Sequence, residues 1–240
     1  MDKKLQNLLF SIYDLLFPLP KVCPICMQQQ KALQICDCCN QDALQKRITF
    51  GQCSRCGSFG VTGNGCHTCE NWPSYYKKNV SLWPYQERYK DVIRAFKFQN
   101  MPWLAEPLAH ALLPYLPQQY DLLMPVPLHR KRLQERGYNQ SELLVRALSQ
   151  HSNIPWQYGL ERIINTPHQT GLNRTKRLEN LHHAFTIVPK ADFVGKKIIL
   201  IDDVCTTGTT LLSCANLLYQ YGATEIVSCT LASGYDRVSQ

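Results

Sequence analysis

Apolar and polar residues recur with a different period in each part of the chain, and the clearest pattern lies near the C-terminal end. The run from Ile198 to Ile201 is continuously apolar, which is typical of a strand buried on both faces of a parallel sheet. Residues 211–219 then carry apolar side chains at helical spacing, and Gly222 is a suitable helix stop. Residues 225–231 are again largely apolar and predict the next strand. The C-terminal part therefore predicts a βαβ unit, which is typical of an α/β fold.

Three further segments have patterns of their own. Residues 3–17 have apolar positions at helical spacing, broken by polar residues and followed by no cleavage site, so they predict an amphipathic helix within residues 1–20. We expect this helix to dock on the protein's own core, with binding to a membrane surface as the alternative. Residues 85–98, which include Lys97, predict an amphipathic helix that caps the sheet, and residues 122–126 predict another strand. No segment is long and apolar enough to span a bilayer, so the expected location is cytoplasmic.

Composition and charge narrow the class of protein. Hydrophobic residues make up 45% of the chain, which is enough for a substantial core and excludes a disordered or fibrous protein. The formal net charge is +8, and residues 76–180 hold fifteen Lys and Arg against eight Asp and Glu. A basic middle favours an anionic partner, although charge alone does not distinguish nucleic acid from phosphorylated small molecules. Scattered lysines on a solvated surface are the simpler alternative.

Nine of the 12 cysteines lie between residues 23 and 69, and eight of them form two sets with the same internal spacing. Each set has a C-x-x-C pair, nine intervening residues and a second pair, and the second set follows the first by thirty residues. Two C-x-x-C turns present four sulfur atoms, which complete a tetrahedral site that suits zinc. The predicted ligands are Cys23, Cys26, Cys36 and Cys39 in the first set, and Cys53, Cys56, Cys66 and Cys69 in the second. This repeat predicts a double zinc ribbon at residues 21–72 with two structural Zn²⁺ ions.

The sequence alone determines neither which cysteine pairs share one zinc ion nor whether Cys38 is a ligand. Local pairing is preferred because a duplication copies a self-sufficient unit, but the inner pairs of the two sets can also join across a thirteen-residue spacer. A disulfide framework is less favoured, because a cytosolic context and repeated C-x-x-C pairs both favour metal. Each site has four cysteines and no open position, so we expect a structural role. Residues 70–80, which are aromatic and basic, are expected to form a linker.

Chemistry-bearing residues follow the predicted strand at 198–201. Asp202 and Asp203 come at its carboxyl end, where α/β sheets place their ligands. The turn Thr206 to Thr209 leads into the predicted helix, so its backbone N–H groups can cradle a phosphate, and Gly208 permits close approach. Two acids beside such a cradle suit hydrogen bonds from sugar hydroxyls. An ordinary strand-to-helix turn would explain the threonines but not the paired aspartates.

These residues resemble known families. The stretch ILIDDVCTTGTT closely matches the phosphoribosyl-pyrophosphate (PRPP) loop of type I phosphoribosyltransferases. The stretch PVPLHRKRLQERGYNQ, residues 125–140, is similar to the motif of the competence protein ComF family, also called ComFC or GntX-like. The stretch QTGLNRTKRLEN, residues 169–180, followed by Ala184 and Phe185, is similar to a downstream block of that family. With the cysteine-rich start, the resemblance covers nearly the whole chain.

The resemblance implies a fold and a set of residue roles. The implied fold is a type I phosphoribosyltransferase-like parallel sheet with flanking helices at residues 80–240, preceded by the small four-cysteine zinc-ribbon module. The acid pair Asp202 and Asp203 would bind the ribose hydroxyls and act in catalysis, with Mg²⁺ bridging ribose and pyrophosphate. The implied contacts to the 5-phosphate are Thr206, Thr207, Gly208 and Thr209. The candidate contacts to the pyrophosphate are Arg130, Lys131 and Arg132. The candidate flexible loop that would close over the substrate holds Arg174, Lys176 and Arg177. Surface positions without a ligand are the alternative for each of these basic residues.

Three functions follow as hypotheses from the resemblance. The first is a competence protein for natural transformation, which would bind PRPP or another phosphorylated sugar or nucleotide. It would handle incoming single-stranded DNA on the cytoplasmic side of the inner membrane, with possible peripheral association. The second is an active phosphoribosyltransferase of nucleotide metabolism, and the third is an adaptor whose zinc module recruits a DNA-uptake channel or a helicase. No motif in the sequence identifies the acceptor of a transfer reaction. Cys205, Cys214 and Cys229 are expected to be buried thiols, with Cys205 the most reactive.

Overall fold

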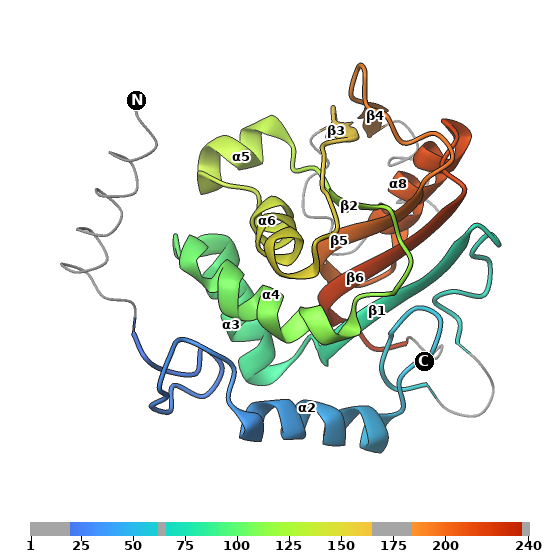
Figure 1. Cartoon of the computed structure of the whole chain (residues 1–240). Helices are drawn as coiled ribbons and strands as arrows, with labels where there is room; N and C mark the ends of the chain where they lie inside the picture. The colour runs from blue at the N-terminus through green and yellow to red at the C-terminus, as the bar shows by residue number, and fades with distance from the viewer. Residues whose placement is uncertain (1–19, 62–65, 165–183, 237–240) are drawn as a thin grey trace, which may run out of the picture.

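A parallel sheet of four strands forms the centre of the molecule (Figure 1). The computed structural model describes residues 20–61, 66–164 and 184–236. The strands are β1 (Tyr76–Pro84), β2 (Leu122–Pro125), β5 (Lys197–Cys205) and β6 (Glu225–Ser233), in the order β1-β6-β5-β2. All three pairings between neighbouring strands are parallel, as expected for strands joined by helical crossovers.

Two layers of helices cover the sheet because its strands are apolar on both faces. In β5, Ile199 and Ile201 belong to one buried cluster, whereas Ile198 and Leu200 belong to the other. The helices α3 (Glu87–Phe98), α4 (Ala105–Leu112) and α6 (Gln140–Ser152) pack on the first face, and α8 (Thr209–Gln220) packs on the second (Figure 1). The predicted α/β fold with a parallel sheet and flanking helices is confirmed.

Shorter elements complete the domain. They are the helix α5 (Arg130–Arg136), the 3₁₀ turns η1 (Pro102–Leu104) and η2 (Leu113–Tyr115), and the antiparallel pair β3 (Leu160–Arg162) and β4 (Phe185–Ile187). Within the described residues, no helix combines the length and the apolar character that crossing a bilayer requires.

The cysteine-rich segment lies along the edge of this domain, where α2 (Asp37–Phe50) runs between its two halves (Figure 1). The first strand, β1, begins at Tyr76, so the prediction of a linker is wrong for residues 76–80. Its register shifts between Tyr76 and Asn79, and this irregularity breaks the alternation by which a strand is recognised. The predicted N-terminal helix falls on residues 1–19, which lie outside the described residues.

Candidate functional site

The turn between β5 and α8 leads into the start of a helix, with Thr206 exposed and Gly208 and Thr209 buried. Gly208 is the N-cap residue of α8, has a left-handed φ of +71°, and provides no side chain to cap the helix. The hydroxyls of Thr207 and Thr209 lie 2.8 Å apart and bond to each other. Since the first N–H groups of a helix lack intrahelical partners and carry a partial positive charge, this turn suits a phosphate.

Trp72, from the cysteine-rich segment, packs directly on this turn. A Cβ atom placed on Gly208 would lie 2.6 Å from Cζ2 of Trp72, closer than side-chain contacts allow. Trp72 is 5% exposed, and its ring stacks on Tyr76 of β1 at a centroid distance of 4.5 Å. Glycine is therefore required at position 208 both by its backbone conformation and by this neighbour.

The acid pair lies at the carboxyl end of β5 and is held by two other elements. The Oδ1 atom of Asp202 accepts hydrogen bonds from the Ser141 hydroxyl and from the Asp203 backbone N–H, each at 2.9 Å. Asp203 is buried, and its Oδ1 atom lies 2.8 Å from Nζ of Lys97. Ser141 comes from the first turn of α6 and Lys97 from the last turn of α3, so three elements meet at these two carboxylates.

Burial and charge set the protonation of this cluster. Burial, followed by the negative charge of Asp203, raises the pKa of Asp202 to about 7, while Lys97 opposes this rise. Burial alone would lower the pKa of Lys97, but the Asp203 carboxylate outweighs it and the pKa is raised. Near neutral pH Asp202 is therefore partly protonated, while Lys97 keeps its charge.

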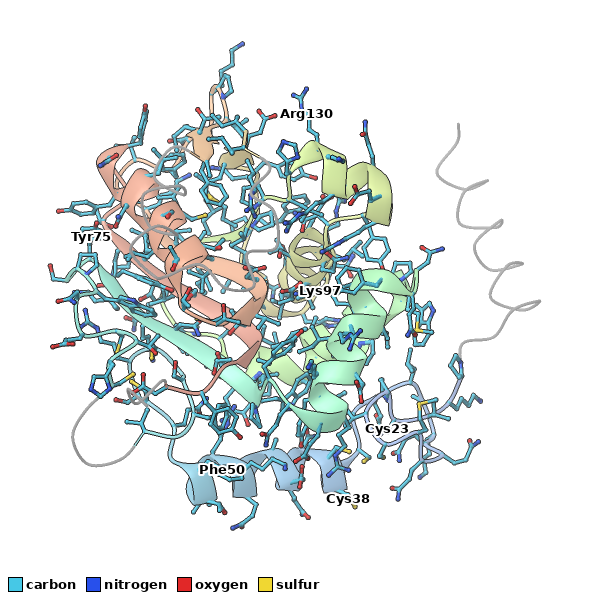
Figure 2. The ribbon with its side chains drawn as sticks, turned by 180° about the vertical axis from the view of Figure 1, so that it is seen from behind. Cys23, Cys38, Phe50, Tyr75, Lys97 and Arg130 are labelled. Atoms are coloured by element: carbon cyan, nitrogen blue, oxygen red, sulfur yellow. The ribbon has the colours of Figure 1, made fainter. Side chains whose placement is uncertain are left out.

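The structure separates the three candidate pyrophosphate contacts. The side chain of Arg130 is 83% exposed and pairs with Glu161 at 2.9 Å, and Figure 2 shows it projecting from the rim of the molecule. Lys131 is also exposed. Arg132 is half-buried, and its pKa is lowered by burial and then by the positive charge of Arg136. The flexible-loop residues Arg174, Lys176 and Arg177 lie outside the described residues.

Three charged or polar side chains that interact with the two aspartates were not predicted as site residues from the sequence: Lys97, Ser141 and Arg162. Lys97 stands out in the sequence only as part of a capping helix, although Figure 2 places it near the middle of the molecule. Ser141 follows the family-like stretch at 125–140 by one residue, and that position is its only signal. Arg162, on β3, has a pKa lowered by burial and by Arg132 and raised by Asp202, so its charge interacts with both. No local pattern marks it.

Two cavities adjoin the site. One of about 490 Å³ is lined by Lys97, Arg132 and Arg136 together with the turn at Gly137. The other, of about 430 Å³, lies beside the turn at residues 206–209, which we call the phosphate-type turn. Its lining residues are Thr206 and Thr207 of that turn, Gly234, Tyr235 and Asp236 after β6, and His67 and Thr68 of the cysteine-rich segment. The cysteine-rich segment therefore forms one wall of a cleft whose opposite wall is the turn.

The predicted metal ligands gather into two separate groups. The sulfur atoms of Cys23, Cys26, Cys36 and Cys39 lie within 4.8 Å of one another, as do those of Cys53, Cys56, Cys66 and Cys69. Sulfur atoms on a tetrahedral zinc, with Zn–S bonds of about 2.3 Å, are about 3.8 Å apart. Four contacts within the groups measure 3.8, 3.6, 3.6 and 3.3 Å, which fits this geometry and is too long for a disulfide. The grouping is local, as preferred from the repeat, and each group can hold one Zn²⁺.

The remaining cysteines lie outside both groups. Cys38 is exposed at the start of α2 (Figure 2). Cys205, Cys214 and Cys229 are buried, as expected. Burial and then the charge of Asp202 raise the pKa of the Cys205 thiol to about 12, and burial raises the pKa of Cys229 to about 12 as well. That Cys205 is the most reactive of the three therefore stays a prediction.

Comparison with known proteins places these features in a family. Residues 138–239 match the model of the phosphoribosyl transferase domain. The chain is 35% identical to competence protein F of Haemophilus influenzae over 196 residues, which covers 76% of this chain and 85% of that one. It is 30% identical to competence protein ComFC of Bacillus subtilis, covering 76% and 78% of the two chains. It is also 30% identical to the DNA utilization protein YhgH of Salmonella typhi, covering 80% and 87%.

The two cysteine groups, the parallel sheet and the acid pair thus occur in a chain that matches competence proteins along most of its length. The chain belongs to the competence protein ComF family and carries a phosphoribosyl transferase domain behind a module with two four-cysteine groups.

Proposed function

We propose that this competence-related protein binds PRPP with Mg²⁺ at the carboxyl end of β5, and that it handles incoming single-stranded DNA on the cytoplasmic side of the inner membrane. The observation that carries the proposal is one continuous stretch of chain. The paired acids Asp202 and Asp203 lie among the last four residues of β5, which ends at Cys205, and the start of α8 follows with Gly208 as its N-cap. A sugar phosphate needs acceptors for its hydroxyls and donors for its phosphate, and this stretch supplies both.

The contacts of the bound sugar follow from this geometry. The 5-phosphate lies on the first turn of α8 and on the threonine hydroxyls, while the ribose hydroxyls donate to the two carboxylates. Mg²⁺, which loses its water reluctantly, would be held mainly by the ribose and the diphosphate and would supply positive charge there. Burial raises the pKa of Asp202 to about 7, and hydroxyl donors on its oxygen atoms would favour the ionised form when the sugar binds.

The same contacts can serve transfer of the phosphoribosyl group. In that reaction the bond from C1 to the diphosphate oxygen breaks, its electron pair leaves with the diphosphate, and the acceptor forms the new bond to C1. Positive charge on the sugar is then stabilised by the carboxylates and negative charge on the diphosphate by the nearby cations. Transfer to an acceptor is the second candidate function, favoured by the match to the phosphoribosyl transferase domain.

Single-stranded DNA enters the proposal through the family and the charge. The relatives named competence proteins and the DNA utilization protein support a role connected with DNA. The cations between residues 76 and 180 would supply phosphate contacts along a strand, and such contacts give a steep loss of affinity with salt. A role as an adaptor for an uptake channel or helicase predicts no such dependence.

The test is the double substitution Asp202→Asn and Asp203→Asn, which keeps the size of both side chains. Calorimetry with PRPP and Mg²⁺ is expected to show at least about a hundredfold loss of affinity, since two charge-assisted hydrogen-bond acceptors are lost. Transformation frequency in a strain carrying the variant should fall together with binding. Asp192→Asn, on an exposed carboxylate paired with Lys196, is the control and should change neither quantity.

Three outcomes bear on the proposal. Loss of PRPP binding and of transformation together supports it. Unaltered PRPP affinity in the double variant contradicts the assignment of the acid pair. Lost PRPP binding with normal transformation separates the ligand from the competence role, and leaves the adaptor as the remaining function.

A further inference from the structure

Lys97 connects two neighbouring features, the acid pair and the cavity lined by cations. Its Nζ atom lies 2.8 Å from Oδ1 of Asp203, and the two side chains are only 16% and 10% exposed. Each charge of a buried ion pair needs the other, because an unpaired buried charge is costly. The carboxylate of Asp203 is therefore engaged by Lys97 at the position where a sugar hydroxyl is proposed to bind.

The same lysine lines the cavity of about 490 Å³ between the end of α3 and the helix α5 with Gly137 that follows it. Lys97, Arg132 and Arg136 bring three positive charges to its wall, and Glu135 brings a negative one. Burial and the charge of Arg136 lower the pKa of Arg132, so these cations act on each other at short range. A multiply charged anion in this cavity would relieve their repulsion.

Hydrogen bonds fix the cavity relative to the acid pair. The Tyr138 hydroxyl donates to the carbonyl of Phe96 at 2.7 Å, next to Lys97 in the chain. Ser141, three residues after Tyr138, donates to Asp202 at 2.9 Å. The ends of α3 and β5 and the start of α6 thus form one cluster. Within it the lysine side chain is the adaptable part, because its four-carbon stem can swing the ammonium group without moving the backbone.

We propose that Lys97 exchanges partners when the ligand binds. Its ammonium group leaves Asp203 for a diphosphate held by Arg132 and Arg136, and the released carboxylate accepts hydrogen bonds from the sugar hydroxyls. This inference rests on the proposed function of the acid pair, and it adds how the site would select a sugar diphosphate over a sugar monophosphate. A sugar 1-diphosphate satisfies every group in the cluster, whereas a sugar monophosphate leaves Lys97 on Asp203. The two halves of the ligand therefore bind cooperatively.

Calorimetry on the full-length, zinc-loaded protein with Mg²⁺ tests the exchange with three probes: PRPP, ribose 5-phosphate and inorganic diphosphate. In the wild type, PRPP is expected to bind at least about a hundredfold more tightly than ribose 5-phosphate. Saturating diphosphate is expected to raise the affinity for ribose 5-phosphate about tenfold. Lys97→Met should weaken diphosphate binding about tenfold and abolish this cooperative effect.

Asp203→Asn distinguishes the exchange from simple damage to the fold. Removing the carboxylate charge releases Lys97 in advance, so the affinity for inorganic diphosphate should rise at least about threefold, whereas a damaged site would bind it less well. Lys90→Met alters an exposed lysine of the same helix and should behave like the wild type with all three probes.

Each result has a defined consequence. Full cooperativity in Lys97→Met, or weaker diphosphate binding in Asp203→Asn, overturns the exchange while PRPP binding itself still stands. A wild type that binds neither PRPP nor ribose 5-phosphate overturns the proposed function, and the exchange of Lys97 with it.

Discussion

The two cysteine units have the same ligand spacing but attach to the rest of the molecule in different ways. The first unit (Cys23, Cys26, Cys36 and Cys39) packs against α3 and α4 through apolar side chains such as Ile25 and Ile35. Polar contacts come from Tyr89, whose hydroxyl donates to the Cys39 carbonyl, and from the pair of Arg88 with Asp42 at 3.0 Å. This unit therefore covers a helix layer and lies away from the phosphate-type turn.

The second unit (Cys53, Cys56, Cys66 and Cys69) is joined to the sheet by hydrogen bonds. The backbone of Phe59 bonds to that of Gly234 and Asp236 beyond the end of β6. The carboxylate of Asp236 accepts bonds from the backbone N–H groups of His67 and Thr68 and from the Thr68 hydroxyl. Trp72, three residues after the last cysteine, packs on Gly208 of the turn. This unit is built into the edge of the candidate site.

The residues between the cysteines account for this difference. Position 25 of the first unit is a buried isoleucine, and its counterpart thirty residues later is Arg55. The Arg55 guanidinium donates to the carbonyl oxygens of Cys69 and Trp72, at 3.2 and 2.7 Å, and so fixes the chain that reaches Gly208. The repeated cysteine pattern thus copies the arrangement of the four sulfur atoms, while the positions in between determine which part of the molecule each unit contacts.

The largest expected effect comes from removing one metal ligand from each unit. Cys36→Ser and Cys66→Ser change equivalent positions of the repeat, and each should lower the bound zinc from two ions to one. Both should lower the melting temperature strongly, since a structural zinc contributes about 10 kcal/mol or more in small domains. Only Cys66→Ser should also weaken PRPP binding, by at least about tenfold, because the second unit holds the wall of the turn.

Zinc analysis, thermal denaturation and calorimetry on both variants measure these effects. The folded fraction of each preparation is determined from its circular dichroism, so that affinities are compared per folded molecule. Equal losses of PRPP affinity in the two variants would contradict the difference between the units.

A smaller effect is expected from Gly208→Ala, which probes the contact between the second unit and the turn. The left-handed φ of +71° costs a side chain about 1–2 kcal/mol, and the added Cβ would meet Trp72 at a further cost of about 1–3 kcal/mol. The matched control is Gly195→Ala, where φ is +75° and nothing lies within 4 Å of the new Cβ. Urea unfolding should show the larger loss for Gly208→Ala, and adding Trp72→Leu should restore part of it. Equal losses of unfolding free energy at both glycines would mean that Trp72 adds no steric cost to a side chain at position 208.

Next in size is Asp236→Ala, compared with Asp42→Ala in the first unit. The Asp236 side chain is 1% exposed, and its removal takes away the buried acceptor of the His67 and Thr68 donors, at a cost of about 2–4 kcal/mol. The Asp42 side chain is 31% exposed, so water can replace it and the cost should be about 1 kcal/mol. The free energy of unfolding in urea measures both. A larger cost for Asp42→Ala would contradict the tighter attachment expected for the second unit.

The elements predicted from the sequence are those whose pattern is local. The run from Ile198 to Ile201, the helix after Gly208 and the strand that follows have a regular apolar period, because each is buried by the sheet and its helices. The metal groups were predictable for a related reason: C-x-x-C turns place their sulfur atoms by spacing alone.

The contacts that join distant segments could not be predicted in this way. Lys97 and Asp203 are 106 residues apart, and only the packing of α3 on the sheet brings them together. The start of β1 at Tyr76 escapes prediction because the bulge that follows it removes the alternation of a regular strand. Trp72 falls within the predicted linker, since nothing around it in the sequence indicates that its ring covers the phosphate-type turn.

The smallest expected effect, close to zero, belongs to Cys38→Ala, and it sharpens the account of the first unit. Cys38 lies between the ligands Cys36 and Cys39, but it is exposed in the first turn of α2 and lies outside both groups of sulfur atoms. Helical geometry turns its side chain about 100° from that of Cys39, so Cys38 faces solvent while the sulfur of Cys39 lies in the group that includes Cys36. Alanine has the higher helix propensity, so stability should rise by a few tenths of a kcal/mol at most. Zinc analysis should still give two ions per chain; one ion would mean that Cys38 is a ligand and that the first unit differs from the second in its metal geometry as well as in its attachment.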